Sequence, residues 1–159
     1  MSKILFQNKD QTFRVCLEER VYNQMLHYCS ISNPYETGGI IIGCYTTDQT
    51  IAKVLHATPP PPSSKQLRHS FCRSNKGLVS ILDNMWKDGS YYLGEWHYHP
   101  NFSPEPSRTD FNQMITLAND YKLHCPEPIL IIIGGNSINW EISISIISGG
   151  QKINLELAE

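Results

Sequence analysis

Two runs of apolar residues constrain the fold of this chain more than any other feature. Ile40–Tyr45 and Ile129–Ile133 are rich in β-branched side chains and carry no charge. Such runs are typical of strands buried on both faces, whereas a strand with one face in water alternates apolar and polar residues. We therefore expect a sheet whose central strands are covered by other elements.

The remaining segments predict a mixture of strands and helices. Apolar residues at helical spacing, such as Val21 and Met25, indicate helices, and short β-branched stretches indicate strands. The mixed order favours an α/β fold of the α+β type, a sandwich in which one curved mixed sheet is flanked by helices. Further strands are expected at 12–15, 50–56, 91–99, 138–147 and 153–157, and helices at 18–28, 75–88 and 107–119.

The bulk composition fits one globular domain. The chain has 159 residues, of which 40% are hydrophobic and 18% charged, so we expect residues 1–159 to form a single domain. The formal net charge of -2 gives no basis for nucleic acid or an anionic membrane as a partner. Neither a signal-peptide core nor a membrane-spanning stretch is visible, so we expect a cytoplasmic protein.

The cysteines are odd in number, widely spaced and without a Cys-x-x-Cys pair, a pattern that does not suggest a disulfide framework. We expect all of them to be reduced and mostly buried. They are Cys16, Cys29, Cys44, Cys72 and Cys125.

The clearest chemical signal is a His-x-His-Pro sequence at His97 and His99. Side chains alternate between the two faces of a strand, so both imidazoles should point the same way. The proline ends the strand, and an irregular stretch then lets the chain turn back toward a helix that opens at Ser107. Asp110, in the first turn of that helix, can supply a third ligand.

Two histidines and one carboxylate leave one coordination position open, as in catalytic rather than structural zinc sites. Zinc at such a site lowers the pKa of a bound water to about 7 and polarises a scissile carbonyl. The sequence therefore predicts a zinc hydrolase with His97, His99 and Asp110 as ligands. Glu36, in a turn before a buried strand, is the candidate general base.

Each part of this pattern has an ordinary alternative. The two histidines alone fit core or surface positions of a strand, and Ser107 with Asp110 alone fits a helix-capping pair. Glu36 alone fits an exposed turn residue. Gly38 and Gly39 fit a simple turn more readily than a close approach of the backbone to the site.

Two further features have more than one interpretation. Glu95 lies on the same strand face as His97, where it is a supporting partner, a competing ligand or an ordinary polar residue. Pro59–Pro62 lacks amide donors and cannot join the interior of a sheet, which predicts an exposed loop. That loop is either a connector or a wall of a substrate channel.

The combined pattern resembles the JAMM motif of the JAB/MPN metallopeptidase family. The motif comprises Glu36, His97-x-His99 with its proline, and Ser107-x-x-Asp110. The resemblance covers roughly the whole chain apart from its two ends. It points to a bacterial subgroup of mobile elements and defence operons, which includes the peptidase of type II CBASS anti-phage systems. Further matching segments are Glu36–Gly39, Ala57–Pro60, Ser70-Phe71, Tyr92–His97 and Pro128–Gly135.

This resemblance implies a JAB/MPN, cytidine-deaminase-like sandwich and a zinc-dependent isopeptidase. Glu36 would take a proton from the zinc water and pass it to the leaving amine, and Ser107 would help to hold the oxyanion. The substrate would be the amide bond after the C-terminal tail of a ubiquitin-like modifier or, preferably, of a nucleotidyltransferase conjugated through its own C terminus. E1/E2-like enzymes would be operon partners.

Two departures from the family pattern affect these expectations. Tyr98 stands where many members have Ser or Thr, and we expect it to point away from the metal. Pro59–Pro62 replaces a loop with more glycine and bears on the substrate range. We expect a substrate tail to contact a sheet edge near Tyr45 or the loop from Thr58 to Arg68.

Three other functions match parts of the pattern. A JAMM peptidase can instead trim a sulfur-carrier or other small modifier precursor, and operon neighbours would discriminate between the two. A noncatalytic MPN scaffold would keep the fold without a working site, but retention of the motif residues argues against it. A zinc nucleobase deaminase would need His-x-Glu with Pro-Cys-x-x-Cys, which the sequence lacks.

Overall fold

The computed structural model describes residues 2–159, so residue 1 of the expected single domain lies outside the described residues. The strands are β1 (Lys3–Gln7), β2 (Arg14–Glu18), β3 (Thr37–Tyr45), β4 (Ala52–Ala57), β5 (Lys65–Gln66), β6 (Phe71–Cys72), β7 (Tyr91–Pro100), β8 (Ile129–Asn136), β9 (Asn139–Ser148) and β10 (Gln151–Leu157). The helices are α1 (Glu19–Ser32), α2 (Leu78–Lys87), α3 (Arg108–Asn119) and the 3-10 helix η1 (Tyr121–Leu123).

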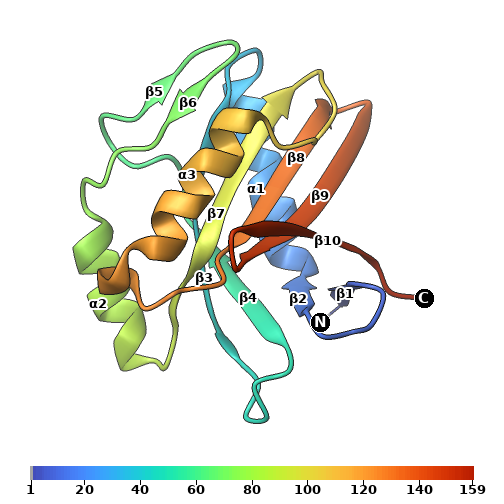
Figure 1. The fold of residues 1–159 in the computed structure, drawn as a ribbon. Helices are drawn as coiled ribbons and strands as arrows, with labels where there is room; N and C mark the ends of the chain where they lie inside the picture. Colours follow the sequence, from blue (N-terminus) through green and yellow to red (C-terminus); the bar gives the residue numbers. More distant parts are fainter. Residues whose placement is uncertain (1) are drawn as a thin grey trace.

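The main sheet is mixed and curved, as expected, but it closes into a barrel. Its strand order is β1-β10-β9-β8-β7-β3-β4-β2, and β1 joins the two ends. Phe6 of β1 lies opposite Leu157 of β10 on one side and opposite Val15 of β2 on the other. β5 and β6 form a separate two-stranded sheet, visible at the upper left of Figure 1.

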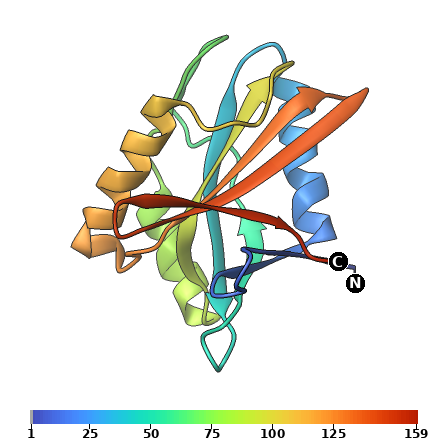
Figure 2. The ribbon, with the colours of Figure 1, turned by 45° about the vertical axis from the view of Figure 1, so that its right-hand side comes forward.

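Helices cover both faces of the sheet, with α1 on one side and α2 and α3 on the other (Figures 1 and 2). We call the α1 side the inner face and the α2 and α3 side the outer face. Ile40, Ile41 and Ile42 of β3 are fully buried, which confirms that this run forms a strand covered on both sides. The residues of α1 that belong to the main core are Val21, Met25 and Cys29.

Closure of the sheet corrects the expectation of a free edge near Tyr45. β3 pairs with β7 on one side and with β4 on the other, and Tyr45 lies opposite Ala52. Its backbone N–H donates to the Tyr91 hydroxyl at 2.8 Å. The Tyr45 N–H is therefore already engaged and cannot donate to a substrate strand at this position.

Most expected elements are present with shifted ends. The helix expected at 18–28 continues to Ser32, and the strand expected at 12–15 begins only at Arg14. β1 and the β5–β6 pair were not predicted. The run Pro59–Pro62 is only partly exposed, because the loop folds back through a Ser64 N–H to Pro61 O hydrogen bond of 3.1 Å and buries Pro61.

The cysteines are all free, but the expectation that most are buried is wrong. Only Cys29 is buried, Cys72 is exposed, and the other three are half-buried. The buried position of Cys29 follows from its place on the core side of α1. Separately, no helix within residues 2–159 has the length and apolar character that a membrane span requires.

Candidate active site

His97 and His99 lie near the C-terminal end of β7 and face the outer side of the sheet, toward α3. The strand alternation sends the intervening Tyr98 to the inner face, where it is fully buried in the main core. Its hydroxyl donates to the Gly135 carbonyl at 2.8 Å. Tyr98 therefore points away from the two imidazoles, as the sequence predicts.

Asp110 reaches the same place from the first turn of α3, where it forms a capping box with Ser107. The Asp110 N–H donates to Ser107 Oγ at 3.0 Å, and the Ser107 N–H donates to Asp110 Oδ2 at 2.9 Å. These two bonds satisfy backbone donors that a helix start leaves free. They also fix the direction of the Asp110 carboxylate.

The two histidines converge on that carboxylate. His97 Nδ1 lies 3.3 Å from Asp110 Oδ1, and His99 Nε2 lies 3.2 Å from Asp110 Oδ2. Two ligands at about 2.0–2.1 Å from a tetrahedral ion are about 3.3 Å from each other. The other nitrogen of His99, Nδ1, lies 3.3 Å from the Ser103 carbonyl, a contact that can orient a metal-binding imidazole.

The three side chains form two pairs that share Asp110. Within residues 2–159, no group of three or more His, Cys, Asp or Glu side chains is arranged so that it could hold a metal ion as it stands. The donor set and both pair distances nevertheless match those of a metal site. His97, His99 and Asp110 are therefore the candidate ligands for a metal ion.

Electrostatics keep the Asp110 carboxyl ionised. Burial acts to raise its pKa, but hydrogen bonds with His97 and His99 and from the Ser107 backbone hold that pKa well below its usual range. For His99, burial acts to lower the pKa, and the facing Asp110 and Glu36 carboxylates outweigh it and raise the pKa above its usual value. The site therefore holds a charged acceptor between two imidazoles.

Glu36 enters the site from the residue just before β3. Its backbone N–H donates to the Leu67 carbonyl at 2.8 Å, which holds the turn in place. Its carboxylate makes no hydrogen bond to another residue in the described part of the chain. Burial is the main cause that raises the pKa of Glu36; nearby His99 opposes this rise and Asp110 adds to it. A free carboxylate with a raised pKa suits proton transfer near neutral pH.

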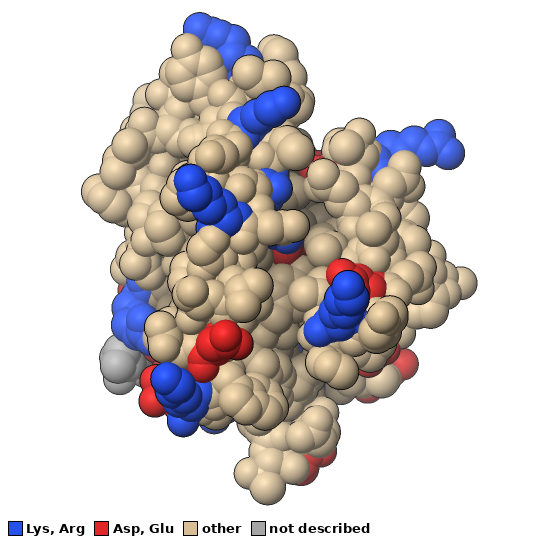
Figure 3. Space-filling view, turned by 90° about the vertical axis from the view of Figure 1, so that its left-hand side faces the viewer, with Lys and Arg blue, Asp and Glu red and all other residues tan. Residues whose placement is uncertain are grey.

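Four of the five motif residues line one cleft of about 390 Å³, namely Glu36, His99, Ser107 and Asp110. The space-filling view shows this side of the molecule hollowed, with acidic atoms inside and Lys and Arg side chains beside the hollow (Figure 3). His97 is buried, with 3% of its surface exposed. The structure therefore brings all five motif residues to one place.

The walls of the cleft contain residues that the sequence did not single out as site residues. His69, in the turn between β5 and β6, and Phe102, after β7, approach each other edge to face with ring centroids 6.1 Å apart. Arg68, at the end of the loop for which we expect a substrate contact, also lines the cleft. Phe102 is 63% exposed, and an aromatic residue within a polar, proline-rich stretch was the available signal.

Gly38 and Gly39 lie within β3, which corrects their interpretation as a simple turn. Gly38 is opposite His97 in the strand register. A Cβ atom added at Gly38 would be 2.3 Å from the Trp96 carbonyl oxygen and 3.0 Å from His97 Cδ2. Glycine is needed here because the Trp96 carbonyl and the neighbouring His97 ring leave no room for a side chain.

Comparison with known proteins identifies the family. Residues 18–143 match the family described as prokaryotic homologs of the JAB domain. This chain belongs to that family. The match spans all the motif residues, and the mixed α/β fold with a curved sheet agrees with it.

The relatives of this JAB-family chain are hydrolases by name. A "CD-NTase/cGAS isopeptidase" of Enterobacter hormaechei is 36% identical over 93% of this chain and 83% of the relative. A "probable metalloprotease" of Sinorhizobium fredii is 29% identical over 79% of each chain. A solution structure of a protein from Desulfitobacterium hafniense superposes on this chain with a TM-score of 0.67 at 22% identity. The superposition covers 90% of this chain and 88% of the other chain, and it supports the fold alone.

The family and these relatives make the JAB-family chain an isopeptidase-type hydrolase, and they indicate a metal cofactor.

Glu95 does not compete as a ligand, since its carboxylate accepts from Arg73 Nε at 2.5 Å and from the Tyr92 hydroxyl at 2.6 Å. Both of its oxygens are therefore engaged. The place of Glu95 is beside the site and not within it.

Proposed function

We propose that this chain is a zinc-dependent isopeptidase that cleaves the amide bond after a C-terminal protein tail in bacterial antiviral defence. The observation that carries the proposal is the convergence of His97 and His99 on Asp110, beside the cleft that Glu36 and Ser107 line. The isopeptidase names of two relatives agree with this chemistry. We further propose that residues 1–159 act as one domain and that the protein works in the cytoplasm.

His97, His99 and Asp110 are the proposed zinc ligands. Imidazole and carboxylate donors with a position left open suit zinc among the common divalent ions. When bound, zinc supplies Lewis-acid activation of water and of the scissile carbonyl. The protein contributes an ionised Asp110 and a His99 whose second nitrogen faces the Ser103 carbonyl.

Glu36 is the proposed general base. Its carboxylate lines the cleft and has no competing partner among the described residues. It takes one proton from the attacking water as the new C–O bond forms, and it gives that proton to the amine nitrogen as the C–N bond breaks. The raised pKa of Glu36, caused mainly by burial, makes this carboxylate a stronger base for the first transfer.

Ser107 is the proposed donor to the developing oxyanion. Its Oγ accepts a hydrogen bond from the Asp110 N–H, so the hydroxyl proton remains free to donate. Ser107 is exposed and lines the cleft, where a substrate carbonyl can reach it. A donor already held in place stabilises negative charge without reorganisation during the reaction.

The proposed substrate is a nucleotidyltransferase joined to a target through its own C terminus, or a ubiquitin-like modifier joined in the same way. The names of two relatives, from Enterobacter hormaechei and Pseudomonas aeruginosa, support the nucleotidyltransferase. Such a conjugate requires a ligation reaction that makes the bond, so E1/E2-like enzymes are the proposed operon partners. The match with this chain covers 83% of the length of the first relative and 73% of the length of the second.

The deciding experiment uses a purified nucleotidyltransferase conjugate with the zinc-loaded protein, the chelator-treated protein and Glu36→Gln. We expect cleavage by the zinc-loaded protein alone, with zinc still bound to Glu36→Gln. Glu141→Gln, an exposed glutamate of β9, is the matched control and should cleave normally. Cleavage only of a linear precursor would support the trimming function, and a protein that binds no zinc would support the scaffold.

A further inference from the structure

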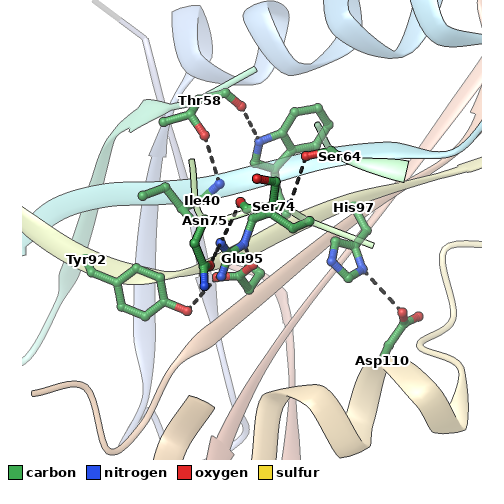
Figure 4. A network of polar contacts seen from close by, with 11 residues as sticks. Ile40, Thr58, Ser64, Ser74, Asn75, Tyr92, Glu95, His97 and Asp110 are labelled. Carbon is green, nitrogen blue, oxygen red and sulfur yellow. Dashed lines mark hydrogen bonds and ion pairs between the residues drawn. The ribbon is translucent and has the colours of Figure 1, made fainter. Parts of the chain in front are cut away.

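A buried ion pair lies beside the candidate metal site, on the same outer face of β7. Arg73 Nε donates to Glu95 Oε1 at 2.5 Å, and Arg73 Nη2 donates to Oε2 at 3.4 Å. The two side chains are only 13% and 4% exposed. Figure 4 shows Glu95 of this pair together with His97, which follows it by two positions along the strand.

Neither partner of this pair is free to move independently. Glu95 Oε2 also accepts from the Tyr92 hydroxyl at 2.6 Å. Arg73 Nη1 donates to the Ser74 carbonyl at 3.1 Å and to Asn75 Oδ1 at 2.7 Å. The planar guanidinium therefore joins its segment to β7 through two hydrogen bonds to Glu95, and its bonds to Ser74 and Asn75 fix its place within that segment.

This connection matters because the segment around Arg73 has no ladder to the barrel. Among the described strands, β6 pairs with β5 only. The β5–β6 sheet carries the cleft wall, including His69 and Phe71. Arg73 follows β6 directly, so its bonds to Glu95 tie that wall to the strand that carries the two histidines.

Phe71 links this wall of the cleft to the proposed ligand His97 through a direct ring contact. The two rings meet edge to face with centroids 5.6 Å apart at an interplanar angle of 74°. Space for this contact exists only because Gly38 has no side chain: an added Cβ would be 2.9 Å from Phe71 Cε2. Phe71 is itself 8% exposed, so its ring occupies one closely packed position.

We propose that Arg73 is a positioning residue that, through its ion pair with Glu95, holds Phe71 against His97 and so sets the orientation of this imidazole. The inference rests on the proposed function in taking His97 as a zinc ligand. Outer contacts of this kind change metal affinity by about 10–100-fold when they are removed. Arg73 is not among the residues that line the cleft, so it acts through Phe71.

The test compares the wild-type protein with the double variant Arg73→Met/Glu95→Gln, which removes the ion pair without leaving one charge buried alone. The first measurement is the NMR signals of the His97 ring in the metal-free protein, where loss of the Phe71 ring contact shifts them. The second is zinc affinity by competition with a coloured chelator, for which we expect a loss of about tenfold or more. The visible spectrum of the cobalt-loaded protein should change as well.

Three single variants separate positioning from general damage. Phe71→Leu keeps the ion pair and should reproduce the loss of zinc affinity. Arg73→Lys keeps the positive charge but lacks the planar fork of the guanidinium, so its zinc affinity should lie between that of the double variant and that of the wild type. Arg20→Met breaks the Arg20–Glu18 ion pair of 2.9 Å at the start of α1 and should leave both the His97 signals and zinc affinity unchanged.

A folded double variant with wild-type His97 signals and wild-type zinc affinity overturns the proposal. If the double variant does not fold, Phe71→Leu is the deciding variant, and wild-type zinc affinity in Phe71→Leu overturns the proposal. If the wild-type protein binds no zinc, the proposed function fails. The His97 signals of the metal-free protein still test the positioning role of Arg73 in that case.

Discussion

Ser107 and Asp110 hold each other in place at the first turn of α3, each through its side-chain oxygen and the other's backbone N–H, at 3.0 and 2.9 Å. The same Asp110 carboxylate faces His97 and His99. Capping and site formation, which the sequence left as alternatives for this pair, therefore occur together. The position of the carboxylate depends on the cap.

Replacement of Ser107 by alanine should affect stability and catalysis by different amounts. Loss of an N-cap side chain lowers the free energy of unfolding by about 1 kcal/mol. Loss of an oxyanion donor should lower kcat by about a hundredfold or more. Asp120→Ala is a matched control, because Asp120 accepts from the Lys122 N–H at the start of η1 and lies outside the cleft lining. Equal kcat in the two variants would remove Ser107 from the chemistry.

Gly38→Ala should disrupt the site from the opposite strand. The new methyl group would lie 2.3 Å from the Trp96 carbonyl oxygen, so we expect a loss of about 3 kcal/mol in the free energy of unfolding, together with lower zinc affinity. Gly150→Ala is the control: its φ of 80° costs about 1–2 kcal/mol, but no atom lies within 4 Å of the added carbon. Calorimetry and chelator competition on both variants provide the comparison, and normal zinc affinity in folded Gly38→Ala would contradict the prediction.

Replacement of residues 60–64 by a glycine linker of equal length should lower turnover of a protein conjugate. The loop is held by burial of Pro61 and by a 3.0 Å hydrogen bond from the Ser74 N–H to Ser64 Oγ, next to the Arg73 segment. Flexible glycine loses both restraints. Ser64→Ala removes only the hydrogen bond and should have a smaller effect in the same turnover assay. Unchanged turnover by the glycine variant would leave this loop as a plain connector.

Cys125 should resist alkylation and lose its contribution to stability only at high pH. Burial, followed by the nearby Glu95 and Glu127 charges, raises its pKa from 9.0 to about 12. Because the pKa of Cys125 is higher in the folded than in the unfolded protein, its contribution to the free energy of unfolding is complete below pH 9. That contribution is lost as the pH rises from 9 toward 12. Iodoacetamide labelling at pH 8 followed by mass spectrometry should modify the exposed Cys72 well before Cys125. Equal labelling rates in the folded protein would refute this.

Local rules explain which parts of the site the sequence could predict. The alternation of a strand places His97 and His99 on one face whatever surrounds them, and the capping preference of Ser107 fixes where α3 begins. Both depend on a few neighbouring residues. The burial of Ile40–Ile42 was predictable for the same reason, because a continuous apolar run needs cover on both faces.

The features that the sequence did not predict depend on partners far along the chain. β1 is a short strand whose role comes from pairing with β10, near the other end of the chain. Gly38 lies in a strand because β3 pairs with β7, and it must be glycine because the Trp96 carbonyl approaches it; the sequence shows neither partner. Glu95 likewise has an ordinary local setting, and its partner Arg73 is 22 residues away.

The pairing of β1 with β10 places the two ends of the described chain at one corner of the molecule, on the side away from the β5–β6 sheet (Figures 1 and 2). The Ala158 N–H donates to the Leu5 carbonyl at 2.8 Å, so hydrogen bonds hold the chain at this corner almost up to its last residue. A fluorescent tag or an affinity handle fused at either end would leave from the same corner and stay clear of the cleft mouth. Labelled forms of this protein can therefore report on substrate capture without obstructing it.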